Sequence, residues 1–231
     1  MTRRDFPLAI ASITLAARPL AAEDARTILA KVAELYPSLH SYTFEGTAIT
    51  EITIKGKVSQ TSLSFTVAYQ EPDKFRLEFR YPNAGNWLRV SDGLFLLEVR
   101  SVTKESSRTP ITPFTIRALN SSPIANFERL FKTAESPTVL RAEAIEVAGR
   151  EIPCDVIQFR SHRRELRENE SPGLSRAWIA KDTGLVLSEE IRTSASMKGE
   201  TSESKRTTTI ANFQINEAIS HETFSTKLPR K

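Results

Sequence analysis

The stretch that decides the fold runs from residue 72 to residue 99 and reads PDKFRLEFRYPNAGNWLRVSDGLFLLEV. Within it Phe75, Leu77 and Phe79 alternate with charged residues, which predicts a strand with one apolar and one charged face. A Pro-Asn-Ala-Gly turn at 82–85 and an Asp-Gly pair at 92–93 predict hairpins on either side of the next strand. Strands joined by such short connections are antiparallel, because parallel pairing needs a long crossover.

The same period of two continues on both sides of this stretch. Further strands are expected in residues 42–54, 63–69, 94–99, 139–147, 152–159, 177–180, 185–191 and 206–215. Residues 160–175 are expected to form a charged loop, and residues 194–204 a polar irregular segment. The sequence therefore predicts an α+β fold dominated by one antiparallel sheet, whose aromatic face needs a cover.

Three helices are candidates for this cover. Residues 23–36 carry apolar side chains at helical spacing, and Pro37 is expected to end that helix. Two short amphipathic helices are expected in the middle of the chain, in residues 111–119 and 123–131. Ser122 followed by Pro123 has the pattern of a helix cap and first turn.

The first 22 residues read as an export signal. Positive charge at Arg3 and Arg4 precedes an apolar run of about twelve residues and a small-residue end at Ala21 and Ala22. The Thr-Arg-Arg-Asp-Phe opening is similar to a twin-arginine motif, although Pro7 and Leu8 depart from its end; the general secretory route stays open. No cysteine lies near residue 22, so we expect a soluble periplasmic protein without a lipid anchor, with residues 23–231 as a single domain.

Composition narrows the possible functions. The 231 residues include only 8 Gly, 3 His and 1 Cys, which disfavours Gly-rich phosphate loops, a His- or Cys-based metal site and a disulfide framework. The net charge of +4 comes with interleaved acids, so a nucleic-acid partner is not expected. Cys154 alternates with Ile152 and Val156, which predicts a buried thiol.

Four stretches together resemble the LolA-like superfamily of periplasmic lipoprotein carriers, related lipid-binding lipoproteins and envelope-stress sensors. They are PDKFRLE at 72–78, LRVSDG at 88–93, TPFTI at 112–116 and WIAKDTG at 178–184, with a looser echo at 224–229. Each motif alone is weak, and their order carries the resemblance.

The resemblance implies a curved antiparallel sheet forming an unclosed half-barrel, covered by the N-terminal helix and a mid-chain two-helix lid. It also implies a carrier of lipid, acyl chains or lipoproteins toward the outer membrane, monomeric and without a cofactor, served by a membrane-bound donor or acceptor. The expected cavity residues are Phe65, Val67, Phe75, Leu77, Phe79, Phe114, Ile116, Phe127 and Phe131. The lipoprotein carrier has an arginine tied to lid closure where this chain has Glu71, and a carboxylate cannot act as that donor.

Three alternatives remain open from the sequence. The aromatic face could be plain core, because the same side chains line cores and cavities. The chain could be a sensor or interaction module that binds a membrane-protein partner through the same fold. Catalysis is disfavoured, since no nucleophile, phosphate-loop or zinc motif is present. His40 reads as a capping or surface residue, Asp92 as a turn residue and Asp155 as a residue of a polar strand face.

Overall fold

The computed structural model describes residues 24–112, 127–132, 134–161, 173–197 and 200–227. Its strands form a single antiparallel sheet in the order β6-β5-β4-β3-β2-β1-β11-β10-β9-β8-β7. The strands are β1 Ser41–Ile54, β2 Lys57–Gln70, β3 Lys74–Tyr81, β4 Gly85–Asp92, β5 Phe95–Arg100, β6 Glu105–Pro110, β7 Ala134–Val147, β8 Arg150–Ser161, β9 Gly173–Ala180, β10 Val186–Met197 and β11 Glu200–Ile215. The helices are α1 Ala25–Ser38, α3 Phe127–Lys132 and the short 3₁₀ turn η2 His221–Phe224.

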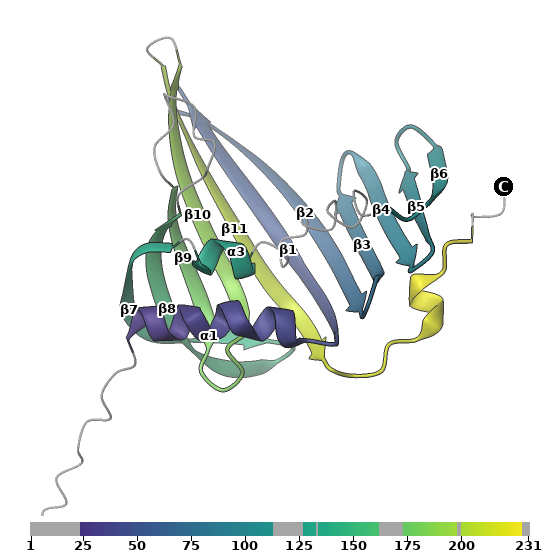
Figure 1. Cartoon of the computed structure of the whole chain (residues 1–231). Helices are drawn as coiled ribbons and strands as arrows, with labels where there is room; N and C mark the ends of the chain where they lie inside the picture. The colour runs from purple at the N-terminus through teal and green to yellow at the C-terminus, as the bar shows by residue number, and fades with distance from the viewer. Residues whose placement is uncertain (1–23, 113–126, 133, 162–172, 198–199, 228–231) are drawn as a thin grey trace, which may run out of the picture.

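The sheet is curved and unclosed, as expected (Figure 1). The pairing of β1 with β11 joins the first and last strands of the chain at the centre of the sheet, which leaves β6 and β7 as its two edges. We call the face that packs against α3 the inner face, and the opposite face the outer face. α1 and α3 lie together on the inner side, next to β7 and β8 (Figure 1).

Strand β3 has the two faces that its sequence predicts. Phe75, Leu77 and Phe79 are buried at 2%, 2% and 8% exposure. On the other face Glu78 pairs with the guanidinium groups of Arg76 and Arg80, each at 2.8 Å. This alternation sets the inner and outer faces for the neighbouring strands, because residues directly opposite in a ladder share a face.

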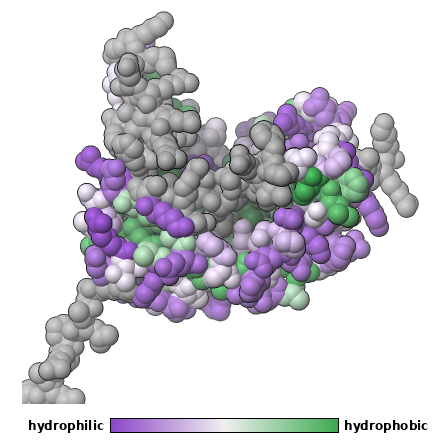
Figure 2. All heavy atoms as spheres, viewed as in Figure 1, coloured by the Kyte–Doolittle hydropathy of each residue, from purple (hydrophilic) through white to green (hydrophobic). Residues whose placement is uncertain are grey.

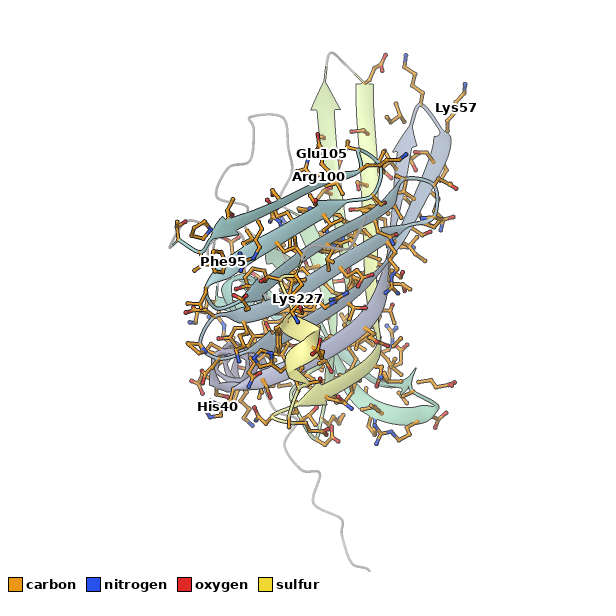
Figure 3. The ribbon with its side chains drawn as sticks, turned by 90° about the vertical axis from the view of Figure 1, so that its right-hand side faces the viewer. His40, Lys57, Phe95, Arg100, Glu105 and Lys227 are labelled. Atoms are coloured by element: carbon orange, nitrogen blue, oxygen red, sulfur yellow. The ribbon has the colours of Figure 1, made fainter. Side chains whose placement is uncertain are left out.

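The C-terminal segment covers part of the outer face. Phe224 of η2 is fully buried, and the Thr226 hydroxyl donates a 2.5 Å hydrogen bond to the Asp92 carboxylate. Figure 3 shows this segment, which ends near Lys227, lying across the strands of that side. Asp92 also accepts hydrogen bonds from the backbone N–H groups of Leu94 and Phe95, which confirms its predicted role in the turn.

Several boundaries differ from the expectation. β2 begins at Lys57, six residues before the expected start, and β6 has no counterpart among the expected strands. The prediction of an irregular segment in residues 194–204 is wrong, because β10 continues to Met197 and β11 begins at Glu200. These polar stretches are strands because their neighbours pair with them, as in the long hairpin whose tip lies next to Lys57 (Figure 3).

The expected lid is seen only in part. The described part of the mid-chain insert holds one helix, α3, and the two-helix lid is not shown. Ile111 and Thr112 are not helical, and the rest of the helix expected over residues 111–119 and the start of the next one lie outside the described residues. α1 continues to Ser38, two residues past the expected end, because Pro37 in the last turn removes only one backbone donor.

Candidate inner-face binding site

The candidate site is the inner face of the sheet, which is apolar over its central strands. Two ladder rows cross it side by side. The first row joins Trp87, Phe79, Phe65, Gly46 and Ile210 across five strands. The second joins Leu63, Ala48, Thr208, Glu189, Ala177 and Ile157 across six. Figure 2 shows apolar residues on the hollowed side beside α1, with hydrophilic residues around them.

Gly46 of β1 lies at the centre of the first row, in close contact with β2 and β11. Gly46 is buried on β1, and a Cβ atom there would lie 2.7 Å from Cζ of the Phe65 ring. The pairing of β1 with β11 is irregular between Glu45 and Gly46. A side chain at position 46 would therefore collide with the Phe65 ring and with the Thr209 carbonyl oxygen, so only glycine fits there.

Aromatic contacts attach the two helices to the inner face. Tyr36 of α1 lies 5.5 Å from Phe127 of α3, between ring centroids, and Phe131 of α3 lies 5.6 Å from Phe159 of β8. The Val186 backbone N–H donates a 3.1 Å hydrogen bond to the Tyr36 hydroxyl. Burial raises the pKa of Tyr36 well above its usual range, and the nearby Glu189 carboxyl adds to that rise. The helices thus cover the β8–β10 side of the face.

Seven of the nine predicted cavity residues lie in the described part of the chain, and all seven are buried. They fall into two groups. The residues of β2 and β3 meet across one ladder, where Phe65 opposes Phe79 and Val67 opposes Leu77. Phe127 and Phe131 of α3 stack on each other next to α1, with 5.9 Å between ring centroids. Phe114 and Ile116 lie outside the described residues, and the ligand role of all nine stays a prediction.

Sequence reasoning missed Glu189, a polar residue on this face. It is 6% exposed, and no described residue donates a hydrogen bond to its Oε1 atom. Burial raises its pKa to about 7, and the charge of Arg206 only partly opposes this. A signal was present: in Leu185, Leu187, Glu189 and Ile191 one acid interrupts an apolar period of two.

Trp87 is the second polar residue of interest on this face. Its indole stacks on Phe79 at 5.7 Å, and the Arg89 guanidinium lies 4.5 Å from its ring centroid. Arg89 also donates a hydrogen bond to Glu98 at 2.5 Å. The indole Nε1–H is buried and has no acceptor among the described residues.

Glu71 stands at the position compared above with an arginine of the lipoprotein carrier, and its side chain pairs with His40. His40 Nδ1 lies 2.7 Å from Glu71 Oε2, and the two side chains are 78% and 48% exposed. His40 is a surface residue, as expected. An exposed pair of this kind stabilises a protein only weakly, so it has no evident role in closing the inner face.

A groove lined by both apolar and charged residues lies away from the predicted residues. It measures about 500 Å³ and runs between α1 and the β9–β10 turn, lined by residues such as Ile28, Leu35 and Thr183. The Lys181 ammonium and the Asp155 carboxylate form an ion pair of 2.9 Å in its wall. This groove does not coincide with the apolar inner face.

Metal-ligating and nucleophilic groups are sparse in the described ranges. Within them no group of three or more His, Cys, Asp and Glu side chains could hold a metal ion. Cys154 is fully buried, as expected, and burial raises the pKa of its thiol to about 11. A thiol in that state is a poor nucleophile.

No helix in the described part of the chain is both long and apolar enough to cross a membrane.

Comparison with known proteins yields similarities of structure. No family model and no curated protein matches the chain. A LolA superfamily protein from Nitrosomonas europaea is 12% identical with a TM-score of 0.34, over 88% of this chain and 98% of that chain. A putative outer membrane lipoprotein-sorting protein domain from Vibrio parahaemolyticus is 10% identical with a TM-score of 0.33, over 87% and 95%.

The complex of MucA and MucB from Pseudomonas aeruginosa also matches. The identity is 14% and the TM-score 0.44, over 87% of this chain and 60% of that chain. The matches include the superfamily that the sequence motifs resemble. At these identities and TM-scores they carry no argument about activity, ligand or partner.

Proposed function

We propose that the chain is a non-enzymatic periplasmic carrier that binds lipid, acyl chains or acylated protein on the inner face of its sheet. One observation supports this most directly: a largely apolar face lies in a sheet whose edges, β6 and β7, do not pair with each other. Helices rather than strands close the described part of that face. An acyl chain can replace apolar contacts of the helices at little net cost, because both bury similar surface.

The rest of the proposal follows from the sequence. Residues 1–22 direct export, and residues 23–231 act as a single domain without cofactor or metal. The ligand passes between a membrane-bound donor and an acceptor on the way to the outer membrane. The exposed Glu71–His40 pair stands where the lipoprotein carrier has its arginine, so the lid of this protein closes by other contacts.

The first test is native mass spectrometry with organic extraction, on protein purified from a bacterial periplasm. The expected result is a co-purifying phospholipid or acylated peptide. A ligand-free mass that does not change on incubation with lipids and lipopeptides would contradict the proposal. It would favour a module that binds a protein partner and whose aromatic face is core.

The two tryptophans provide a matched second test. Trp87 lies on the inner face, whereas Trp178 opposes Val156 on the other face of β9. Trp178→Phe leaves Trp87 as the reporter, and we expect its emission to shift on titration with lysophospholipid. Trp87→Phe leaves Trp178, whose emission should stay constant. Equal responses from both reporters would place the lipid elsewhere or indicate a general change in fold.

A further inference from the structure

The two buried side-chain polar atoms that lack a partner in the described residues are Glu189 Oε1 and Trp87 Nε1. Both lie on the inner face, Trp87 on β4 and Glu189 on β10, with β3, β2, β1 and β11 between them. Trp87 faces Phe79 and through it Phe65, and Glu189 faces Thr208 and through it Ala48. One atom is an acceptor and the other a donor, so the same face leaves both kinds of hydrogen-bonding group unsatisfied.

A carboxyl oxygen that lacks a hydrogen-bond partner on an apolar face needs a physical reason. Native proteins pair nearly all of their buried polar atoms, because a buried group without a partner destabilises the folded state. The neighbours of Glu189 in its row, Ala177 and Thr208, are themselves buried, at 0% and 3% exposure. An apolar side chain would fill this position without that cost. A ligand on the inner face that donates a hydrogen bond to the Glu189 carboxyl would remove this destabilisation when it binds.

The protein's own charges do not provide this partner. Arg206 is exposed and lies one row away, opposite Ile191 rather than Glu189, and it does not donate a hydrogen bond to Glu189 Oε1. Tyr36 approaches from α1 and its hydroxyl oxygen accepts the Val186 N–H, but its O–H does not donate to Glu189 Oε1. On β9 the directly facing residue is Ala177, which has no polar side chain.

We propose that Glu189 is a ligand-binding residue that accepts a hydrogen bond from an N–H group of the acylated molecule held on the inner face. This inference rests on the proposed carrier function and narrows its ligand class. The ligand combines an acyl chain, which contacts the aromatic rows, with a nitrogen that carries hydrogen. Two sources share this chemistry, the ammonium of an ethanolamine phospholipid and the amide of an N-acylated peptide.

The test compares ligands that differ only in the N–H group. Lysophosphatidylethanolamine and lysophosphatidylcholine of the same chain length form one pair. A palmitoyl amide and the matching palmitoyl ester form the other. Binding of each is measured by native mass spectrometry and by competition with a fluorescent fatty-acid probe. At about pH 8 the carboxyl is ionised, and a hydrogen bond to a charged group is strong, so at that pH we expect the N–H member of at least one pair to bind about tenfold more tightly or better. The pair that shows the preference identifies the source.

Variants separate this role from folding. Glu189→Met removes the acceptor and keeps an apolar side chain of similar length, so it should bind both members of each pair equally while remaining folded. Glu189→Gln keeps a carbonyl acceptor and should retain part of the preference. Glu203→Gln removes an exposed charge on neighbouring β11 and should change nothing.

The possible outcomes test the role of Glu189 separately from the proposed carrier function. Failure of the wild-type protein to bind any of the four lipids would contradict the carrier proposal itself. Equal binding of both members in both pairs would leave the carrier proposal intact and overturn the role of Glu189. A preference that survives Glu189→Met would also overturn it.

Discussion

Replacing Glu189 by glutamine should stabilise the protein at alkaline pH and leave its stability nearly unchanged in mild acid. Burial raises the pKa of this carboxyl from 4.5 to about 7, and Arg206 opposes the rise only in part. In the unfolded chain the group ionises near its ordinary value. The folded state therefore holds the neutral form over the interval between the two values.

The sign and size of the effect follow from linkage. A raised pKa in the folded state means that the contribution to stability is fully present below pH 4.5 and is lost as pH rises through about 7. One tenfold change in an ionisation constant is about 1.4 kcal/mol, so the whole loss is about 3 kcal/mol. Glutamine has the shape of the neutral acid and does not titrate. The variant should therefore exceed the wild type in unfolding free energy by about 3 kcal/mol at about pH 8, and by almost nothing near pH 4.

The assay is urea unfolding followed by tryptophan fluorescence, at several pH values between those limits. Taking the difference between the two proteins at each pH removes the titration of the other groups. Glu203→Gln controls for the loss of one negative charge. A difference that stays constant with pH would refute the reasoning, because it would mean that the carboxyl is hydrated or paired in the folded state.

Three further predictions concern other parts of the chain. Leu77→Ala removes a buried inner-face side chain and should lower the unfolding free energy by about 2–5 kcal/mol, whereas Ile54→Ala at the exposed end of β1 should change it by less than about 0.5 kcal/mol, both measured in urea. The Cys154 thiol should react with an aromatic disulfide reagent at least about a hundred times more slowly in the native protein than in urea, because it is buried and burial raises its pKa to about 11; equal rates would contradict its burial. Glu71→Gln should lower the unfolding free energy by less than about 1 kcal/mol, because the pairing of Glu71 with His40 is largely exposed to water; a larger loss would assign that pair a structural role.

The strands that could be predicted are those with one buried face. In β3 the alternation of Phe75, Leu77 and Phe79 with charged residues reports burial directly, and the structure has this strand at residues 74–81. The start of β2 and the ends of β10 and β11 could not be found in this way. Residues 57–62 are exposed on both faces, so their sequence carries no period. They form a strand because β1 pairs with them, and β1 is itself paired with β11 on its other side.

The candidate site could likewise be predicted only in part from the sequence. Which side chains of one strand share a face follows from parity, and this placed Phe65 with Val67 and Phe75 with Leu77. Which strands lie side by side at the centre does not follow, because β1 and β11 are separated by most of the chain. The row that brings Ala48, Thr208 and Glu189 together exists only through that long-range pairing.

The interruption of the apolar pattern is therefore more informative about function than the pattern itself. Phe65, Phe79 and their neighbours are equally compatible with a core and with a cavity, because apolar packing stabilises both. A buried carboxyl is not equally compatible, since a core that serves stability alone gains nothing from Glu189 and loses about 3 kcal/mol above neutral pH. If the inner face were only core, replacing this one residue would improve the protein and remove nothing. The carrier hypothesis instead requires that the gain in stability be accompanied by a loss of ligand selectivity, and the two can be measured on the same variant.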